Sequence, residues 1–337
     1  MTTARKRQVD LSMTSYYHCM ARCVRRAYLC GQDKLTGKDF THRRGWIVEQ
    51  LKRLSSIFAI NICAYAIMNN HYHVVLHVDS NRANAWTADE VLERWGMLFA
   101  GNSLINKYRS GELLTENDQF AITILVEQCR NNLINISWFM RCMNEKIARM
   151  ANTEDDCRGH FWEGRFKSQA LLDMKALLTC MVYVDLNPIR ARVSDSLDDS
   201  DFTSVQERLF ALAKNSSLSA GEKEIAQPLS LAPFSAAESK NVETIIPMSL
   251  LSYLELVDAT GRTIRMDKPG YIPENIKPIL QQLNINSSCF IKVIKNYKNL
   301  FNSAAGSQAK LAEFNQHFGK KWSKGLSGSR LLYAKAA

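Results

Sequence analysis

Residues 60–78 constrain the fold of this chain more than any other segment. The apolar run Ile60–Met68 stops at the pair Asn69–Asn70, and the following run, His71–Val78, alternates strictly between two kinds of side chain. Asparagine pairs favour tight turns, and a period of two is typical of a strand with one buried face. We therefore predict two neighbouring antiparallel strands, the first of them buried and the second carrying histidines on one face.

The alternation in the second strand separates its side chains onto two faces. One face carries the histidines and consists of His71, His73, Val75 and His77. The other face is apolar and consists of Tyr72, Val74, Leu76 and Val78. Alternate side chains lie roughly 6.6 Å apart, so His71 and His73 could bind one metal ion at about 2.1 Å each. A polar strand face with solvated histidines fits the same pattern, and both interpretations stay open. His77 lies one step too far along, and we interpret it as structural or electrostatic.

A second segment, residues 174–190, has a helical pattern that Pro188 should end. Tyr183 and Asn187 are four residues apart and therefore share one helical face. A tyrosine can act as a nucleophile if it is activated, because its ordinary pKa is about 10. A metal ion that polarises a phosphate would help, and Asn187 could supply an oxygen ligand. The alternative is a core tyrosine with a satisfied hydroxyl; Asp185 points to another face and is a poorer candidate.

The rest of the chain alternates between strand-like and helix-like segments. Helical spacing occurs in residues 41–58, 88–108, 115–150 and 174–186, and extended patterns in 15–29 and 161–171. This order favours an α+β fold, in which a small antiparallel sheet is covered by helices. A stretch rich in Ser, Ala and Pro follows at 211–241 and reads as a linker. Beyond it, short helical patterns predict an additional, mostly helical C-terminal module.

Composition and charge narrow the class of protein. The 337 residues carry a net charge of +10, and 46% of them are hydrophobic, which is typical of globular proteins. Lys and Arg outnumber Asp and Glu by 12 to 4 in residues 1–60 and by 13 to 6 in residues 241–337, whereas residues 61–240 hold 18 against 23. Clustered basic residues bind phosphate backbones, although a solvated basic surface would look the same.

The apolar segments and the cysteines indicate where the protein is located in the cell. No apolar run approaches the roughly 20 residues of a membrane span, and residues 1–10 lack the apolar stretch of a secretory signal. The nine cysteines form no C-x-x-C pair, so neither a zinc site nor a disulfide framework is expected. We predict a cytoplasmic protein with no membrane partner.

Several short motifs occur in a fixed order along residues 12–205. They are Ser15-Tyr16-Tyr17-His18 with Arg22-Cys23, Met68-Asn69-Asn70 before His71-Tyr72-His73, Gly159-His160-Phe161-Trp162-Glu163-Gly164-Arg165-Phe166-Lys167-Ser168, and Tyr183 followed by Asn187-Pro188-Ile189-Arg190-Ala191. Together they resemble the single-tyrosine HUH transposases, and within them the REP-associated tyrosine transposases. The resemblance implies a ferredoxin-like, RRM-like core.

The resemblance also implies an activity. In this family, paired histidines hold Mg²⁺ or Mn²⁺ on the scissile phosphate of single-stranded DNA. A tyrosine attacks that phosphate, forms a 5′-phosphotyrosyl link and frees a 3′-hydroxyl, which later rejoins strands. By motif position Tyr183 is the nucleophile, His71 and His73 are metal ligands, and Asn187 is a third polar ligand. The expected function is metal-dependent DNA transposition and recombination next to hairpin, REP-like sequences.

The extent of the resemblance and the candidate linker together set the expected domain boundaries. We expect a catalytic domain at 1–210 with a helical insertion at about 85–128, a linker at 211–241 and a basic accessory module at 242–337. The module carries Lys292, Lys295, Lys298, Lys320, Lys321 and Lys324 among the aromatics Phe290, Tyr297, Phe301, Phe314, Phe318 and Trp322. This mixture indicates an accessory DNA-binding module; dimerisation or packing is the alternative.

Contacts with single-stranded or hairpin DNA can be assigned to two groups of side chains. Backbone phosphates would be bound by Arg22, Arg25, Arg26, Arg43 and Arg44. Trp162, with Phe161 and Phe166, could stack unpaired bases, and Arg165 and Lys167 flank Phe166. Core packing is the alternative for the aromatic residues.

Two other functions stay open at this point. One is a domesticated, cleavage-inactive regulator that binds hairpin DNA on the same fold, and the other is an RNA-binding module. The sequence also leaves open the target hairpin, and whether a monomer or a homodimer, with the tyrosine acting in trans, is the active unit.

Overall fold

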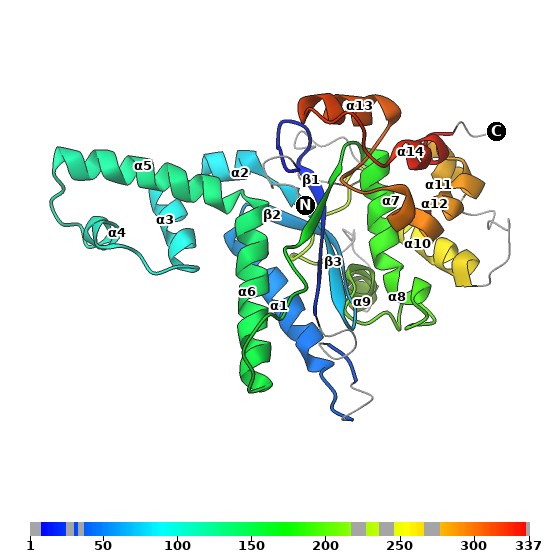
Figure 1. The fold of residues 1–337 in the computed structure, drawn as a ribbon, viewed down its shortest axis with the longest axis horizontal. Helices are drawn as coiled ribbons and strands as arrows, with labels where there is room; N and C mark the ends of the chain where they lie inside the picture. The colour runs from blue at the N-terminus through cyan, green and yellow to red at the C-terminus, as the bar shows by residue number, and fades with distance from the viewer. Residues whose placement is uncertain are drawn as a thin grey trace.

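A five-stranded sheet forms the centre of the protein (Figure 1). The computed structural model describes residues 8–24, 30–32, 37–216, 227–235, 246–265 and 277–334. The strands are β1 (Tyr16–Arg22), β2 (Ile60–Ile67), β3 (His71–Val78), β4 (Lys167–Leu171) and β5 (Ala304–Ala305). They lie in the order β2-β3-β1-β4-β5, and neighbours are antiparallel except for the parallel pair β4-β5.

The first four strands have the ferredoxin-like arrangement. Helix α1 (His42–Ile57) connects β1 to β2, and α6 (Ile136–Glu154) precedes β4, so that the chain runs β-α-β-β-α-β with β1 and β3 in the middle. Both helices cover the same face of the sheet, where their apolar residues share one core with β3. The predicted α+β class, with a small, mainly antiparallel sheet covered by helices, is confirmed.

Strand β3 presents the two faces that its alternation predicts. Tyr72, Val74, Leu76 and Val78 belong to the core beneath α1 and α6, whereas Val75 belongs to the core on the opposite face. The backbone N–H of Met68 donates to the carbonyl of His71 at 2.8 Å and closes the turn between β2 and β3. The face with the histidines is therefore turned toward the second helical layer.

That second layer is built on α7 (Met174–Asp185). The helix packs against β2, β3 and β4, and ends before Pro188, as predicted. Pro188 lies in the first turn of the short helix α8 (Asn187–Arg190), where no intrahelical partner for an N–H is needed. Helix α9 (Ser204–Ser216) follows and lies against β2.

Four helices extend away from the sheet. They are α2 (Ser80–Ala85), α3 (Ala88–Gly96), α4 (Ser103–Arg109) and α5 (Glu116–Leu133), and α3 to α5 form the arm that projects from the body in Figure 1. Capping boxes begin α3 at Thr87 and α5 at Thr115, which explains why the helices start there. Helices thus occupy the region predicted as an insertion.

Five helices follow in the described C-terminal part of the chain, and two of them, α10 (Leu250–Arg265) and α12 (Ser287–Leu300), pack on α7. The other three are α11 (Lys277–Gln282), α13 (Gln308–His317) and α14 (Leu326–Leu332). Helices α10 and α12 share the apolar core of α7, and β5 extends the sheet beyond β4. The predicted separation at 211–241 stays a prediction; in its described part the N–H of Ala232 donates to Ile62 of β2. Helix α12 lies beside α7, the helix that carries Tyr183.

In the described ranges, no helix has the length and apolar character that crossing a membrane would require.

Candidate active site

Three histidines meet on the face of the sheet below α7. The rings of His71 and His73 lie 5.0 Å apart between centroids, at 81° to one another. A third ring, His18 of β1, joins them, and its Nε2 lies 2.8 Å from Nδ1 of His73. The antiparallel register pairs His18 with Val75 and so places it diagonally to His73 on the same face. The local pattern around His18, a histidine in a strand-like run, does not by itself indicate a role at this site.

The fourth histidine of this face, His77, lies outside the cluster. Its Nδ1 is 3.2 Å from the amide nitrogen of Asn61, and its ring packs on Tyr16 with 4.6 Å between centroids. This placement agrees with the structural role predicted for it.

Burial keeps the clustered histidines neutral. It lowers the pKa of His18 and of His71 to about 4, and the positive charges of Arg22 and Lys298 further lower the pKa of His71. Burial also holds the pKa of His73 well below its ordinary value. A neutral imidazole carries one N–H and one lone pair, and the lone pair is what a metal ion binds.

Helix α7 places Tyr183 directly over this cluster. Its ring meets His73 edge-on, at 5.8 Å between centroids and 88° between planes, and the guanidinium carbon of Arg190 lies 4.5 Å from its centroid. On the other side the ring of Tyr297 from α12 stacks on it at 4.5 Å. Tyr183 is therefore only 4% exposed. Burial raises the pKa of its hydroxyl, and the charge of Arg190 acts in the opposite direction.

Asn187 lies one turn beyond Tyr183 and is buried. It is close enough to affect the pKa of Tyr183, yet its Nδ2 has no hydrogen-bond partner among the described residues. A half-turn of the Asn187 side-chain amide would bring its oxygen to this unsatisfied position. A buried amide without a partner is the kind of group that a bound ligand would satisfy.

Asp185 has a different task, as its different helix face predicts. It accepts hydrogen bonds from Ser204 of α9 and Tyr253 of α10, and burial raises its pKa to about 6. It thus ties three helices together away from the histidines.

Two imidazoles and one amide, from His71, His73 and Asn187, could together hold a divalent metal ion. Across the described ranges, no group of three or more His, Cys, Asp and Glu side chains is arranged to hold a metal, so Asn187 would be needed as the third donor. Nδ1 of His71 lies 2.6 Å from Oδ1 of Asn70. Because an amide oxygen only accepts, that nitrogen carries the proton and Nε2 keeps its lone pair. Such outer hydrogen bonds are typical of metal-binding histidines.

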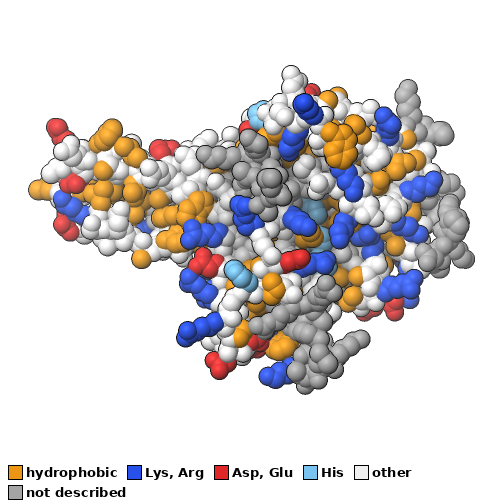
Figure 2. Space-filling model, viewed as in Figure 1, with side chains coloured by type: hydrophobic (Ala, Val, Ile, Leu, Met, Phe, Trp, Pro, Cys, Tyr) orange, Lys and Arg blue, Asp and Glu red, His pale blue; other side chains and the backbone are white. Residues whose placement is uncertain are grey.

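Basic side chains surround the cluster. Arg22, at the end of β1, pairs with His71 across the strands, Lys167 begins β4, and Lys298 lies one residue after Tyr297; all three are exposed. Figure 2 shows Lys and Arg side chains gathered on this face around a small area where histidine atoms reach the surface. The arrangement would attract an anionic ligand.

Two of the predicted phosphate-binding arginines are occupied within the fold. Arg43 is 1% exposed and forms ion pairs with Glu154 and Asp155 at the end of α6. It is a structural residue, which corrects the expectation that it contacts DNA. Arg44 is half-buried and donates to the carbonyl of Cys30 at 2.9 Å. Arg25 and Arg26 lie outside the described residues.

The predicted base-stacking aromatics belong mostly to the core. Phe161 and Phe166 are buried, so core packing is the correct interpretation for them. Trp162 is half-buried; its Nε1–H donates to the carbonyl of Asn144 at 2.8 Å and its ring packs on Tyr72. The neighbouring Arg165 and Lys167 are exposed.

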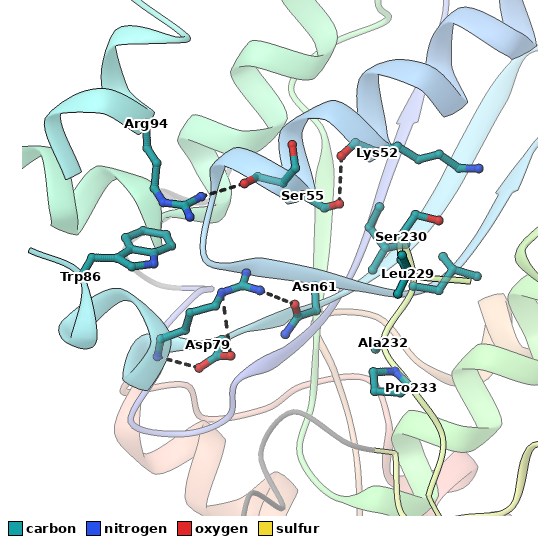
Figure 3. A pocket seen from close by; sticks show the side chains of 14 residues that line it. Lys52, Ser55, Asn61, Asp79, Trp86, Arg94, Leu229, Ser230, Ala232 and Pro233 are labelled. Carbon is teal, nitrogen blue, oxygen red and sulfur yellow. Dashed lines mark hydrogen bonds and ion pairs between the residues drawn. The ribbon is translucent and has the colours of Figure 1, made fainter. Parts of the chain in front are cut away.

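A separate cavity of about 560 Å³ lies at the β2 edge of the sheet (Figure 3). Its lining includes Lys52, Asn61, Asp79, Arg82, Trp86 and Arg94. None of the three clustered histidines, nor Tyr183, lines it. The positive charges there are already engaged, because Lys52 pairs with Glu207 and Arg82 donates to Asn61 and to the carbonyl of Phe58.

The chain has low similarity to a solved structure and matches neither a family model nor a curated protein. Among solved structures, one described as a REP-associated tyrosine transposase bound to a REP hairpin is similar, with a TM-score of 0.37 and 10% sequence identity, over 68% of this chain and 99% of that one. A likeness at this TM-score carries no argument about function, so the function proposed below rests on the residues of this chain.

Proposed function

We propose that this protein is a metal-dependent transposase that cleaves and rejoins single-stranded DNA near hairpin sequences through a covalent 5′-phosphotyrosine. The observation that supports this best is the position of Tyr183, edge-on to His73 and below the guanidinium of Arg190. A nucleophile, two neutral imidazoles and a cation thus share one cluster. The order of the sequence motifs in residues 12–205 gives independent support.

The donor groups for the metal ion would be Nε2 of His71, Nε2 of His73 and the amide oxygen of Asn187. Bound Mg²⁺ or Mn²⁺ would polarise the scissile phosphate and neutralise developing negative charge.

Tyr183 would carry out the covalent step. Its hydroxyl oxygen attacks the phosphorus and forms a new O–P bond, while the bond from phosphorus to the 3′-oxygen breaks. The phenol loses one proton and the leaving 3′-oxygen gains one, so the step consumes no net proton. The positive charge of Arg190 favours the phenolate during the attack. The reverse attack by a 3′-hydroxyl restores the phosphodiester, which lets the same site rejoin strands.

Access to Tyr183 requires a movement. The side chain is 4% exposed because Tyr297 stacks on it. Because Tyr297 belongs to α12, a shift of α12 away from α7 would uncover Tyr183. We therefore expect DNA binding and displacement of α12 to be coupled.

The exposed basic residues around the cluster would hold the DNA backbone. Arg22, Lys167 and Lys298 come from β1, β4 and α12, and together flank the histidines. Arg165 would extend this surface. Contacts of this kind position a strand and make its binding salt-dependent, without reading its sequence.

The test is an assay for a covalent adduct. Wild type, Tyr183→Phe and the control Tyr16→Phe, which lies on the same face against His77, are incubated with labelled hairpin-bearing single-stranded DNA and Mn²⁺. Wild type and the control should give an SDS-resistant adduct that EDTA prevents, and Tyr183→Phe should bind the hairpin without forming one.

Each other outcome has a definite meaning. Undiminished adduct formation by Tyr183→Phe would refute the assignment of the nucleophile. Hairpin binding by wild type with no adduct would favour the cleavage-inactive regulator, and a preference for RNA would favour the RNA-binding module.

A further inference from the structure

A continuous hydrogen-bond chain links the C-terminal part of the protein to His73. The amide Nε2 of Gln169 in β4 donates to the carbonyl of Asn302 at 2.9 Å. Its Oε1 lies 2.8 Å from the hydroxyl of Tyr297 and 3.4 Å from Nδ1 of His18. Nε2 of His18 then meets Nδ1 of His73 at 2.8 Å. All the side chains in this chain are buried, so their hydrogen-bond partners are fixed by one another.

The backbone carbonyl of Asn302 decides which way the Gln169 amide points. A carbonyl oxygen can only accept, so the amide group facing it has to be the NH₂. In the reversed orientation, the Gln169 oxygen would lie 2.9 Å from the carbonyl oxygen of Asn302, and two acceptors cannot form a hydrogen bond. The hydrogen bond from the Tyr297 hydroxyl to the Gln169 oxygen would also be lost. The oxygen of Gln169 is thus directed at Tyr297 and His18, and it requires a donor from each.

This orientation determines where the protons lie on the two imidazoles. Nδ1 of His18 faces the Gln169 oxygen and must carry the N–H, which leaves Nε2 of His18 as the acceptor. Nδ1 of His73 therefore donates to it and holds the proton of that ring. Nε2 of His73 is left with the lone pair, on the same nitrogen that is free in His71.

We propose that Gln169 and His18 are positioning residues that hold His73 in its Nδ1–H tautomer, with the backbone carbonyl of Asn302 in the C-terminal region fixing the orientation of Gln169. The tautomer itself follows from the hydrogen bonds alone. Its use, to present Nε2 of His73 to a metal ion, rests on the proposed function. The opposite tautomer would place a proton on that nitrogen and block it.

The strand pairing explains why this chain of contacts can form. His18 and Gln169 are direct cross-strand partners in the β1-β4 pair, and β4 also pairs with β5, just after Asn302. Tyr297 lies in α12, which Figure 1 shows beside α7 and close to the sheet edge. Residues far apart in the chain thus converge on one side-chain amide, which gives the C-terminal region a task at the candidate active site.

Direct measurement of the tautomer tests the proposal. The full-length protein, which has seven histidines, is labelled with ¹⁵N-histidine and studied without metal by long-range ¹H–¹⁵N correlation spectroscopy. The signals of His73 are assigned as those that disappear in His73→Gln. Wild type should show His73 protonated on Nδ1. Gln169→Met should give a mixture of both tautomers, and Tyr297→Phe should keep the Nδ1–H form, because Asn302 still orients Gln169. A wild-type His73 protonated on Nε2, or an unchanged tautomer in Gln169→Met, would overturn the proposal.

Mn²⁺ binding to the same proteins without DNA gives a second readout. Loss of an outer hydrogen bond typically lowers metal affinity by roughly 10- to 100-fold, and we expect this for Gln169→Met, with Tyr297→Phe close to wild type. Equal affinities in wild type and Gln169→Met would count against the proposal. An Nδ1–H tautomer in a wild type that binds no Mn²⁺ would support the hydrogen-bond chain and refute the metal site of the proposed function.

Discussion

The ring of Tyr183 lies stacked on the ring of Tyr297, with 4.5 Å between centroids and 25° between planes. Tyr183 belongs to α7, below which the histidines gather, and Tyr297 belongs to α12 in the C-terminal third of the chain. Tyr183 also meets His73 edge-on, with 5.8 Å between ring centroids. Two regions that sequence patterns assign to different modules therefore meet at the proposed nucleophile.

Removing the ring of Tyr297 should expose Tyr183. Tyr297→Ala leaves a cavity in a buried site, and we expect it to lower the free energy of unfolding by about 3 kcal/mol, as for other aromatic truncations. Nitration of Tyr183 by tetranitromethane, followed by peptide mass spectrometry, should become faster. Tyr297→Phe is the matched control, because it keeps the ring and should keep Tyr183 protected. Equal protection of Tyr183 in Tyr297→Ala would contradict the covering role of α12.

Substitution of His71 should weaken metal binding, whereas substitution of His77 should not. The two residues lie on the same face of β3, yet only His71 is part of the cluster with His73. We expect His71→Gln to lower Mn²⁺ affinity by at least about 10-fold and His77→Gln to retain it, measured by calorimetry without DNA. Loss of binding in both variants, or in neither, would argue against the two-imidazole site.

The free energy of unfolding should fall between pH 7 and pH 5. The pKa of His18 and of His71 is about 4 in the folded protein, against an ordinary value of 6.5. Between those values the unfolded chain binds protons that the folded protein excludes, so acidification favours unfolding. Each imidazole whose pKa is lowered from 6.5 to about 4 should reduce the free energy of unfolding by roughly 3 kcal/mol once the pH has fallen below both values.

Asp185 acts in the opposite direction. Its pKa is about 6, above its ordinary 3.8, so the folded protein takes up this proton first and gains stability as the pH falls through 6. One carboxyl group offsets one of the three clustered histidines, and the net expectation is still a loss. Urea unfolding at pH 7 and pH 5 in EDTA measures it; equal or greater stability at pH 5 would be inconsistent with neutral buried histidines.

Substitution of Arg43 should lower stability, whereas substitution of Lys167 should weaken DNA binding. Arg43→Ala strands the carboxylates of Glu154 and Asp155 at the end of α6 and should cost about 3 kcal/mol of unfolding free energy. Lys167→Ala changes an exposed residue and should alter stability by no more than about 0.5 kcal/mol. It should instead weaken binding of single-stranded DNA and reduce the salt dependence by about one phosphate contact. Denaturation and salt-dependent binding curves check both; a Lys167→Ala that binds like wild type would remove it from the DNA surface.

The parts of the fold that sequence predicted correctly are those encoded locally. The turn at Asn69–Asn70 and the alternation of β3 are visible within a few residues, because strand and turn preferences depend on neighbouring side chains. The helix that carries Tyr183 and its end before Pro188 are local in the same way. The two faces of β3 followed directly from the period of two.

Long-range contacts were beyond such patterns. His18 joins His73 only through the register of β1 against β3, and nothing within residues 15–22 specifies that pairing. The sequence offers one indication of its position: in a strand-like run, His18 lies on the same face as Tyr16 and Met20. The burial of Arg43 also depends on distant partners, because Glu154 and Asp155 lie at the end of another helix. The position of α12 over Tyr183 likewise depends on packing between distant segments.

The measurement that tests the central claim most directly is the location of the covalent bond. Wild-type protein is incubated with hairpin-bearing single-stranded DNA and Mn²⁺, treated with nuclease and protease, and the peptides are read by tandem mass spectrometry. We predict a 5′-phosphonucleotide on the oxygen of Tyr183, and none on Tyr297, whose ring stacks directly against it. A nucleotide on any other residue, or cleaved DNA with no modified peptide, would contradict the assignment of Tyr183 as the nucleophile.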